Sequence, residues 1–440
     1  MREQTILIIG EVFIDTHLDI IDKNGPLVRL GGIFHSARAF SSLGINYAMA
    51  YFAPAYLDAD INEWACFLKT KGCYKLGNID HAPNIMLVHE SKESGHQGYY
   101  NILKDQAEYH NEKNLLEIIR IAEPTDILLY PGRYDKKLII NYLNDYKGRV
   151  HIDFHYDSDS ILNSVERVIE TVILSTSSDF FKCVCGGKLD NLIQYFDKHS
   201  INYFLLKENR GGSYCYSVDN RVTYESASYY VPTMHSVGVG DVYNSIFITN
   251  LFDDNIKKRM RLAALCAAKY AETMSYNKFK NNVQLVNNNI DELEKLRGIR
   301  LSWQSRSEKN IYLAAPDFPD VDTSLLDKLN NCLLYHNFKT HLPIRENGLV
   351  SKSMKSEDEL ILYQNDINLL YSCDLLIAVL LYNDSGTLVE LGMFKNTGKP
   401  TILFDPYNYC YNMFLRHTPD HLCRTIIDVI EATYLCLGMR

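Results

Sequence analysis

The sequence predicts two α/β domains with largely parallel sheets, and three observations support this fold class. The chain has 440 residues, more than one ordinary hydrophobic core organises, so two domains are expected. Short apolar runs alternate with helical patterns along the whole length, as in α/β proteins. A charged stretch without strand pattern, 291–308, separates the two series of runs. It predicts a linker between a domain at 1–290 and a smaller domain at 309–440.

Composition excludes several classes of protein. Hydrophobic residues make up 46% and charged residues 22%, the balance of a soluble globular chain. No apolar run reaches the roughly 18 residues of a membrane span, and the N-terminus lacks a secretory signal, so a cytoplasmic location without a membrane partner is expected. A net charge of −9 without a basic block argues against nucleic acid. The eleven cysteines and fourteen histidines show no metal-binding spacing, so no metal site is predicted.

In the first domain, the apolar runs are short, rich in branched residues and bounded by turn residues. Such runs predict strands of a sheet that is buried on both faces. The predicted strands are TILIIGEV (5–12), TDILLYPG (125–132), RVHIDF (149–154), TVILST (171–176) and YFLLKEN (203–209).

A glycine-rich stretch, GVGD, runs from Gly238 to Asp241 and precedes an apolar helical pattern. A helix start leaves aligned N–H groups unpaired, and these groups with the helix dipole favour a phosphate. Gly238, Val239 and Gly240 are therefore candidates for an anion hole. Asp241 on the first turn is a candidate base that takes a proton from a hydroxyl beside that phosphate. The alternative is structural, because an acidic residue stabilises many helix starts.

Two earlier stretches accompany this motif. Asp15 follows the first apolar run in IIGEVFIDTHLD, and Gly31 and Gly32 precede a helical pattern in VRLGGIFHSARAFSSLG. The order of the three stretches resembles the PfkB/ribokinase family of sugar and nucleoside kinases over roughly residues 4–285. The resemblance implies a ribokinase-like α/β sandwich that uses ATP and Mg²⁺. It also implies that Asp15 binds substrate hydroxyls and that the two glycines let the sugar approach.

The first domain departs from the family pattern at several positions. His35 stands where the family usually has a substrate-binding Asn, and His235 where an Asp usually opens the GxGD motif. Val239 replaces the usual Ala, and Asn209 replaces a glycine. His35 is retained as a substrate-binding candidate, because an imidazole can hydrogen-bond a hydroxyl. Two interpretations stay open: phosphorylation of a sugar or nucleoside hydroxyl, or a ligand sensor with a degenerate site.

The stretch 363–404 of the second domain carries three acidic candidates for a catalytic site. Asp366 lies on a predicted helix, Asp384 in the loop after the predicted strand DLLIAVLL, and Glu390 on the helix that follows. Loops at the carboxyl ends of parallel strands line the ligand crevice, so Asp384 and Glu390 are expected to face one cleft. Paired carboxylates suit cleavage of a glycosidic bond. The alternative is again structural, with Asp384 or Ser385 capping the helix and Glu390 near its positive end.

Four stretches of this domain match one family in order: IYLAAPDF (311–318), YQNDINLL (363–370), DSGTLVELG (384–392) and YNMF (411–414). The domain resembles the nucleoside 2-deoxyribosyltransferase family over roughly 309–436. The resemblance implies a flavodoxin-like, doubly wound parallel sheet without a cofactor. It also implies that Glu390 is the nucleophile, forms a covalent deoxyribosyl ester, and is oriented by the hydroxyl of Tyr312.

The same resemblance assigns the remaining candidates. Asp366 and Asp384 would bind the nucleobase and handle its proton, and Gly386 would belong to the substrate-binding loop. Asn412 would bind sugar hydroxyls, and Met413 would pack nearby. In the family these last residues reach the site of a neighbouring subunit, so a homo-oligomer is implied.

A related branch hydrolyses deoxynucleoside 5′-monophosphates and binds the phosphate with small hydroxyl residues in this loop. Asp384 would repel a phosphate and favours a free nucleoside, whereas Ser385 and Thr387 leave the hydrolase branch open. The overall prediction is a bifunctional enzyme that acts on nucleosides, sugars and ATP. One alternative is a sensor that regulates a nucleotide-depleting N-glycosidase, and another is a pair of folds that serve as scaffolds without catalysis.

Overall fold

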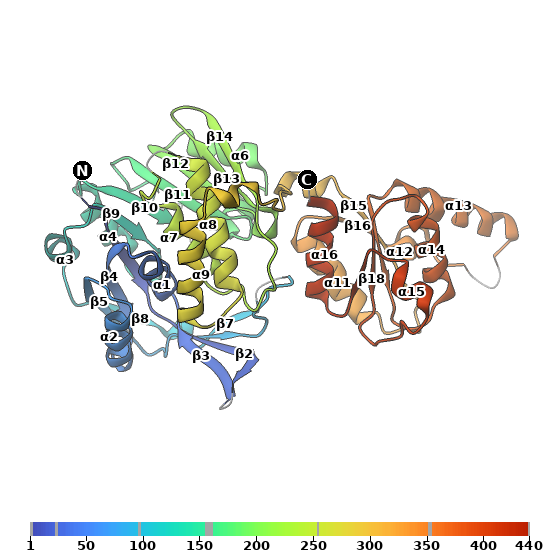
Figure 1. Cartoon of the computed structure of the whole chain (residues 1–440), viewed down its shortest axis with the longest axis horizontal. Coiled ribbons are helices and arrows are strands. Elements are labelled where there is room, and N and C mark those ends of the chain that lie inside the picture. The colour runs from blue at the N-terminus through green and yellow to red at the C-terminus, as the bar shows by residue number, and fades with distance from the viewer. Residues whose placement is uncertain are drawn as a thin grey trace. The chain divides into compact units, whose positions relative to one another are not determined.

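The computed structural model describes residues 3–22, 25–95, 98–154, 162–252, 255–350 and 354–438 (Figure 1). The chain divides into two compact units, and both are α/β as the sequence predicts. Unit 1 contains the described residues up to 92 and from 98 to 298, and unit 2 contains 93–95 and those from 299 onward. Among the described residues, no helix has the length and apolar character needed to cross a membrane.

The main sheet of unit 1 has ten strands in the order β14-β13-β12-β11-β10-β9-β1-β4-β5-β8. Its seven central strands, β12 to β5 in that order, are parallel, and the edge strands are antiparallel. The strands are β1 (Thr5–Glu11), β4 (Asn46–Ala53), β5 (Gly72–Asp80), β8 (Glu108–Asn111), β9 (Asp126–Leu129), β10 (Arg149–Asp153), β11 (Ile169–Ser175), β12 (Ile201–Lys207), β13 (Ser213–Ser217) and β14 (Val222–Ser226). All the apolar runs predicted as strands of this domain lie in its parallel part, which confirms that prediction.

A second, smaller sheet of unit 1 has the order β3-β2-β6-β7. Its strands are β2 (Ile14–Asp22), β3 (Gly25–Leu30), β6 (Ile85–Val88) and β7 (Tyr99–Asn101). Asp15 lies in β2 and pairs in register with Arg29 of β3. The two candidate substrate-binding segments, around Asp15 and around Gly31, are therefore joined by one antiparallel ribbon.

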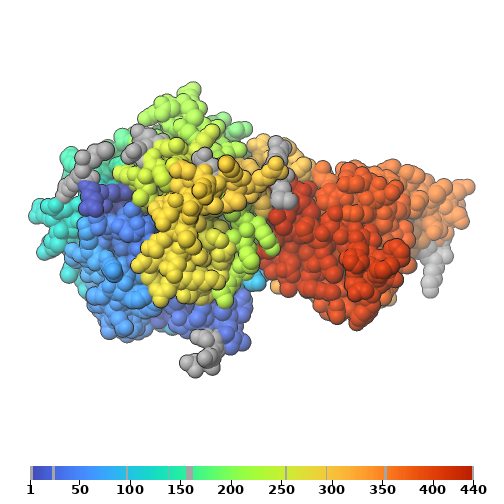
Figure 2. Space-filling view, viewed as in Figure 1, coloured from blue at the N-terminus to red at the C-terminus, as the bar shows by residue number. Residues whose placement is uncertain are grey.

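Helices cover both faces of the main sheet. They are α1 (Ile33–Leu43), α2 (Asp58–Phe67), α3 (Leu115–Ala122), α4 (Lys136–Asn144), α6 (Leu189–Phe196), α7 (Val239–Phe247), α8 (Ile256–Ala271) and α9 (Tyr276–Asn288), with short turns η1 (Ala55–Leu57), η2 (Lys104–Gln106), η3 (Phe180–Val184), η4 (Asn209–Gly211) and η5 (Glu292–Lys295). Side chains alternate across a strand, so Ile6 and Ile8 of β1 pack in the core with α1 and α7–α9, while the equally buried Leu7 and Ile9 lie on the opposite face. Figure 2 shows the yellow helices α8 and α9 beside blue N-terminal residues on the surface of this unit, and α9 packs against α1.

Unit 2 has one parallel sheet in the order β16-β15-β17-β18-β19, the doubly wound 2-1-3-4-5 arrangement. Its strands are β15 (Asn310–Ala314), β16 (Lys339–His341), β17 (Leu375–Val379), β18 (Thr401–Phe404) and β19 (His421–Cys423). Its helices are α10 (Trp303–Ser307), α11 (Ser324–Tyr335), α12 (Pro343–Asn347), α13 (Ser356–Ser372), α14 (Ser385–Lys395), α15 (Met413–His417) and α16 (Ile426–Gly438). The flavodoxin-like prediction is confirmed.

Strand alternation decides which side chains of β15 reach the helices of each layer. Ile311 and Leu313 pack with α11 and α16, whereas Tyr312 and Ala314 pack with α13 and α14 on the other face. Figure 1 shows α11 and α16 on one side of this sheet and α13 and α14 on the other. Tyr312 therefore points toward the helix that carries Glu390.

The segment 291–308 is more structured than a linker. The unit boundary at 298/299 falls inside it, η5 and α10 form within it, and Ile299 and Leu301 join the core of unit 2. Arg306 is completely buried and donates to the carbonyl oxygens of Leu301 (3.2 Å) and His336 (3.1 Å). The sequence predicts a charged linker here because composition does not distinguish a buried arginine from an exposed one.

We expect Arg306→Ala to lower the free energy of unfolding of unit 2 by about 2–3 kcal/mol. The substitution removes the donor to two buried carbonyl oxygens, those of Leu301 and His336. It also removes a buried guanidinium whose volume the alanine does not refill.

Urea unfolding monitored by Trp303 fluorescence measures this loss. The chain has two tryptophans, so a Trp64→Phe background leaves Trp303 of α10 as a reporter of unit 2. Gln304→Ala, at an exposed position of the same helix, is the matched control. Equal stability of the Arg306 and Gln304 variants would contradict the anchoring role of Arg306.

Candidate functional site

A short hydrogen bond joins the two central candidates of unit 2. The Tyr312 hydroxyl donates to Glu390 Oε1 at 2.6 Å. Tyr312 is completely buried on β15, and Glu390 is half-buried on α14. Because β15 and the β17–α14 connection flank the point where strand order reverses, the pair lies at the ligand-binding edge of a doubly wound sheet. The structure brings these two residues together as the sequence predicts.

The surroundings of Glu390 favour its protonated form. Burial raises its pKa to about 7, and the hydrogen bond from Tyr312 opposes this rise. The negative charges of Asp366 and Asp384 raise the pKa further. Burial, with the nearby Glu390 charge, also raises the pKa of Tyr312, so its hydroxyl keeps its proton and remains a donor. Glu390 therefore titrates near neutral pH, as suits a group whose charge changes during a reaction.

Asp366 and Asp384 come to this site from different elements. Asp366 lies on α13 and accepts from Asn347 Nδ2 at 2.7 Å. Asp384 is the N-cap of α14, and its Oδ2 accepts from the backbone N–H of Thr387 (2.7 Å) and from the Thr387 hydroxyl (2.9 Å). The capping alternative for Asp384 is thus observed. It coexists with an electrostatic effect, since the nearby Asp384 raises the pKa of Glu390. Gly386, in the first turn of α14, is exposed.

Asn412 and Met413 lie at the start of α15, on a loop fixed by a buried carboxylate. Asp405 is completely buried and accepts from the N–H groups of Tyr409 (2.7 Å) and Cys410 (2.9 Å). Asn412 caps α15 by accepting from the N–H of Phe414 at 2.8 Å. Both Asn412 and Met413 are exposed, and within the described ranges no hydrogen bond joins either of them to Glu390.

In unit 1, the candidates around Asp15 form a closed cluster. Asp15 is 3% exposed and His35 is 2% exposed, and His35 Nε2 lies 3.0 Å from Asp15 Oδ2. Burial alone would raise the pKa of Asp15, but the contact with His35 and the charge of Arg29 hold it below its usual value. Burial lowers the pKa of His35 to about 4, so the imidazole is neutral at pH 7. Its Nδ1 lies 2.8 Å from the hydroxyl of Tyr270.

The glycines of unit 1 permit close approaches that a side chain would block. A Cβ added to Gly31 would lie 2.2 Å from Asp15 Oδ1, and one added to Gly32 would lie 2.2 Å from the Glu11 carbonyl oxygen. A Cβ added to Gly238 would lie 2.2 Å from the His35 ring, and Gly238 also has a left-handed φ of +74°. His35 therefore links the Asp15 segment directly to the GxGD turn.

The GxGD stretch forms a helix start, as predicted. Helix α7 begins at Val239 with Gly238 as N-cap, and Asp241 lies in its first turn. Burial and the charge of Asp153 raise the pKa of Asp241 to about 7, while Lys207 opposes this rise. Asp241 thus titrates near neutrality, in the range that suits a general base.

The sequence reasoning missed Asp153 and Lys207. They end β10 and β12, and Asn244 of α7 connects them: Lys207 Nζ donates to Asn244 Oδ1 at 2.8 Å, and Asn244 Nδ2 donates to Asp153 Oδ2 at 2.5 Å. Both residues stand at the carboxyl ends of predicted strands. That position was the signal available in the sequence, because such ends line ligand crevices.

His235, where a family Asp was expected, has a structural environment. It is completely buried, and its Nε2 lies 3.2 Å from the Thr273 carbonyl oxygen. Arg29 of β3 donates to the Val237 carbonyl oxygen at 3.1 Å and so ties the small sheet to the segment before α7. Burial and the charge of Arg29 lower the pKa of His235, so it remains neutral.

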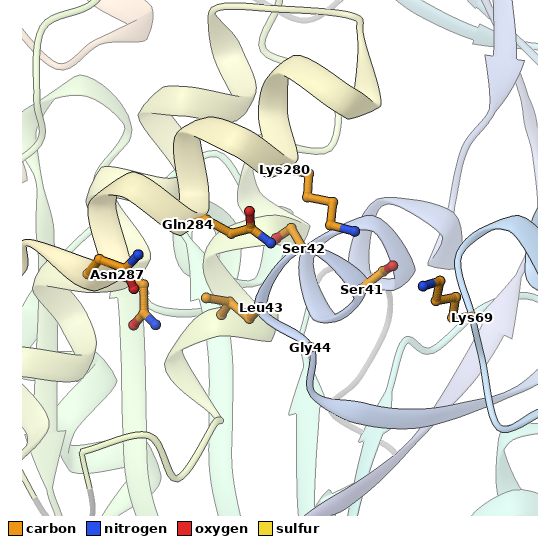
Figure 3. A pocket seen from close by; sticks show the side chains of 9 residues that line it. Ser41, Ser42, Leu43, Gly44, Lys69, Lys280, Gln284 and Asn287 are labelled. Carbon is orange, nitrogen blue, oxygen red and sulfur yellow. The ribbon is translucent and has the colours of Figure 1, made fainter.

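A separate cavity of about 450 Å³ opens at the end of α1 (Figure 3). Lys69, Lys280 and the side-chain amides of α9 line it together with the residues that end α1. None of the predicted site residues lines this cavity. Within the described ranges, His, Cys, Asp and Glu side chains form no group of three or more that could hold a metal ion.

Comparisons with known proteins agree with this division. Residues 311–419 match the family model for nucleoside 2-deoxyribosyltransferases, which confirms the resemblance for this part of unit 2. In structure, the chain is similar to a candidate ribokinase from Agrobacterium tumefaciens (TM-score 0.51, 12% identity, 66% of this chain and 99% of that chain). It is also similar to ribokinase from Giardia lamblia (TM-score 0.51, 13% identity, 65% of this chain and 99% of that chain).

At these identities the structural likeness shows the fold alone, and it confirms the ribokinase-like fold of the N-terminal part. Comparison with the curated proteins gave no match. The chain thus combines a ribokinase-like fold with a segment, 311–419, that matches the nucleoside 2-deoxyribosyltransferase family model.

We expect Tyr312→Phe to raise the pKa of Glu390, because it removes a hydrogen bond that stabilises the ionised carboxylate. Carbon-13 NMR titration of labelled glutamate carboxyls measures this pKa, and the resonance lost in Glu390→Gln identifies the site. Tyr363→Phe, at an exposed position on α13, is the control and should leave the titration unchanged. An unshifted Glu390 resonance in Tyr312→Phe would rule out the electrostatic coupling of this pair.

Proposed function

We propose that unit 2 cleaves or exchanges the N-glycosidic bond of 2′-deoxynucleosides through a covalent intermediate on Glu390. The observation that carries this proposal is the 2.6 Å hydrogen bond that holds one oxygen of a half-buried Glu390 against Tyr312. It orients the carboxylate and leaves the second oxygen, Oε2, available for attack. The family match over residues 311–419 supports the same reading.

In the proposed reaction, Glu390 Oε2 attacks the anomeric carbon of the nucleoside. The bond to the base nitrogen breaks, the electron pair stays on the base, and the base takes a proton from solvent water while Asp366 and Asp384 position it. The sugar remains as an ester on Glu390. Water or a second base then attacks the same carbon and releases the Glu390 carboxylate, which gives hydrolysis or transfer respectively.

The charges at the site favour a substrate without a 5′-phosphate. Three carboxyl groups lie near one another at this site, those of Glu390, Asp366 and Asp384. The charges of the two aspartates raise the pKa of Glu390, which indicates that they are close to it. Thr387, whose hydroxyl could bind a phosphate, is 1% exposed, and this hydroxyl donates to Asp384. We therefore assign free 2′-deoxynucleosides, rather than deoxynucleoside monophosphates, as the preferred substrates.

A second copy of the chain would complete this site. Tyr411 (73%), Met413 (61%) and Phe414 (72%) are exposed around the cap residue Asn412, and clustered exposed apolar side chains are typical of protein interfaces. We infer that this segment, 411–414, packs against unit 2 of another copy and brings Asn412 to its sugar site.

Glu390→Gln should abolish product formation, with a rate loss on the order of 10³-fold or more, because the amide is a poor nucleophile. Each 2′-deoxynucleoside and its 5′-monophosphate is incubated with and without a second base, and products are separated by chromatography. Free base alone indicates hydrolysis, and a new nucleoside indicates transfer.

The matched control is Glu359→Gln, an exposed position in the first turn of α13 that should retain full activity. In the wild type, the rate should rise between pH 6 and pH 8, because a nucleophile with a pKa of about 7 ionises over this range. If Glu390→Gln turns over substrate at the wild-type rate, the covalent mechanism is refuted.

For unit 1, we propose ATP-dependent phosphorylation of a sugar or nucleoside hydroxyl. The residues present fit a phosphate: α7 starts with a left-handed glycine, its first turn offers N–H groups, and a lysine stands beside Gly240. ATP with Mg²⁺ would supply the phosphoryl group, and the cation would rely on phosphate oxygens with one or two carboxylates such as Asp153. Asp241 would take the proton of the acceptor hydroxyl.

One observation favours the alternative of a ligand sensor. The His35 ring contacts Gly238 and its Nε2 lies 3.0 Å from Asp15, so an imidazole occupies the space between the acceptor-binding carboxylate and the GxGD turn. A sugar that binds Asp15 must displace this ring or accept a hydrogen bond from it. In the sensor alternative, displacement of the His35 ring reports that a ligand is bound, and no phosphoryl transfer follows.

Asp241→Asn separates the two proposals for unit 1. If unit 1 is a kinase, ADP production with a panel of sugars and nucleosides should fall by roughly 10²–10⁴-fold, the usual contribution of a general base. The wild-type rate should rise through pH 7, because Asp241 ionises with a pKa of about 7. Asp105→Asn, at an exposed position, is the control. If the wild-type protein binds one of these acceptors but never consumes ATP, the sensor proposal is supported and the kinase proposal is refuted.

A further inference from the structure

The cavity at the end of α1 brings polar side chains together from three separate segments of unit 1 (Figure 3). Its volume of about 450 Å³ lies within the range of small-molecule sites. Ser41 comes from the last turn of α1, Lys69 from the turn after α2, and Lys280 from α9. The cavity is also lined by three side-chain amides near the end of α9, those of Gln284, Asn287 and Asn288.

The charge of this lining is positive, although the chain as a whole carries a net charge of −9. Among the described residues that line the cavity, Lys69 and Lys280 are charged and none is Asp or Glu. Figure 3 shows both lysine side chains directed toward Ser41 from different sides. Two ammonium groups that point toward one place repel each other, and an anion between them would turn this repulsion into attraction.

The backbone holds Lys69 in a conformation that a lysine rarely adopts. Its φ is +59°, in the left-handed region where a glycine usually ends a helix. Its N–H donates to the Cys66 carbonyl oxygen at 3.0 Å, and the N–H of Thr70 donates to the Ala65 carbonyl oxygen at 3.1 Å. A glycine would form this turn at a lower cost in free energy, so the turn itself does not require a lysine.

Stabilisation of α1 does not account for the two lysines either. A cation near the end of a helix is favourable because the last carbonyl oxygens lack partners. Here the carbonyl oxygens of Phe40 and Ser41 accept from the N–H groups of Ile45 (3.1 Å) and Gly44 (3.3 Å). Within the described ranges, no hydrogen bond or ion pair engages the ammonium group of either lysine. Both ammonium groups therefore keep their donors for a ligand.

Ser41 offers a further donor between the lysines. Its Oγ lies 2.7 Å from the hydroxyl of Tyr276, and this contact joins α1 to α9. The phenol is the more acidic hydroxyl of the pair, so we assign Tyr276 as the donor. Ser41 then keeps its own proton for an acceptor in the cavity.

We propose that this cavity binds a small phosphorylated sugar, with the phosphate between Lys69 and Lys280 and the sugar hydroxyls on the amides of α9. Ammonium and hydroxyl donors suit a phosphate, whereas side-chain amides both donate and accept and so suit hydroxyl groups. A nucleotide fits less well, because Leu43 is the one apolar side chain among the described lining residues and offers no aromatic face to a base. The site is one of binding, since no carboxylate lines it to act as a base, and it does not depend on the activities proposed for either unit.

Calorimetric titration of the full chain with ribose 5-phosphate, ribose and inorganic phosphate tests this proposal. Lys69→Met/Lys280→Met should weaken the binding of ribose 5-phosphate by roughly tenfold to a hundredfold, because it removes hydrogen bonds to a charged group. Neither lysine belongs to the core, so this variant should fold. Lys71→Met/Lys278→Met removes the same charge at two exposed positions that do not line the cavity, and it should bind as the wild type does.

Each outcome of these titrations decides the proposal. Weakened binding in the first variant alone supports it, together with wild-type binding of ribose 5-phosphate that is roughly tenfold or more tighter than that of phosphate. Equal affinity of the first variant and the wild type overturns it, because the ligand then binds elsewhere. Equal weakening in the control variant overturns it as an effect of net charge. Wild-type protein that binds none of the probes, or binds phosphate as tightly as ribose 5-phosphate, overturns it as well, the latter leaving an adventitious ion only.

Discussion

The hydrogen bond between Tyr312 and Glu390 is the interaction on which the proposed chemistry of unit 2 depends. It exists because β15 is buried on both faces, so that alternate side chains of one strand reach different helical layers. Tyr312 cannot move away from α14 unless the core between the sheet and helices α13 and α14 opens. The strand therefore acts as a rigid support that holds one oxygen of a carboxylate whose burial already favours protonation.

The two units place their candidate catalytic carboxylates in related positions. Asp241 lies in the first turn of α7 and Glu390 in the middle of α14, each helix packs at the carboxyl edge of a parallel sheet, and burial raises the pKa of each carboxylate to about 7. The neighbours differ. A neutral tyrosine hydroxyl faces Glu390, which suits attack on a carbon, whereas the Lys207 ammonium stands near Asp241, which suits an anionic partner.

Periodic features of the sequence predicted most of the fold and part of the site. Apolar runs identify the parallel strands because those strands are buried on both faces, and glycine-rich turns identify the start of α7. Lys207 and Asp153 escaped prediction because β11 separates their strands, so only the sheet brings them together. The burial of Arg306 was not predicted, because it depends on contacts that form only in the folded chain. These contacts are its hydrogen bonds to the carbonyl oxygens of Leu301 and His336.

The capping role of Asp384 and the contact of His35 with Gly238 show why structural and functional interpretations need not compete. Asp384 caps α14 through Thr387 and at the same time raises the pKa of Glu390, so one carboxylate serves the fold and the proposed chemistry. His35 is different, since its neutral ring contacts both Asp15 and the Gly238 turn. A ligand that binds Asp15 must compensate for the lost contact with that ring. Binding at this carboxylate is therefore coupled to the position of α1 and of the turn before α7, whichever function unit 1 performs.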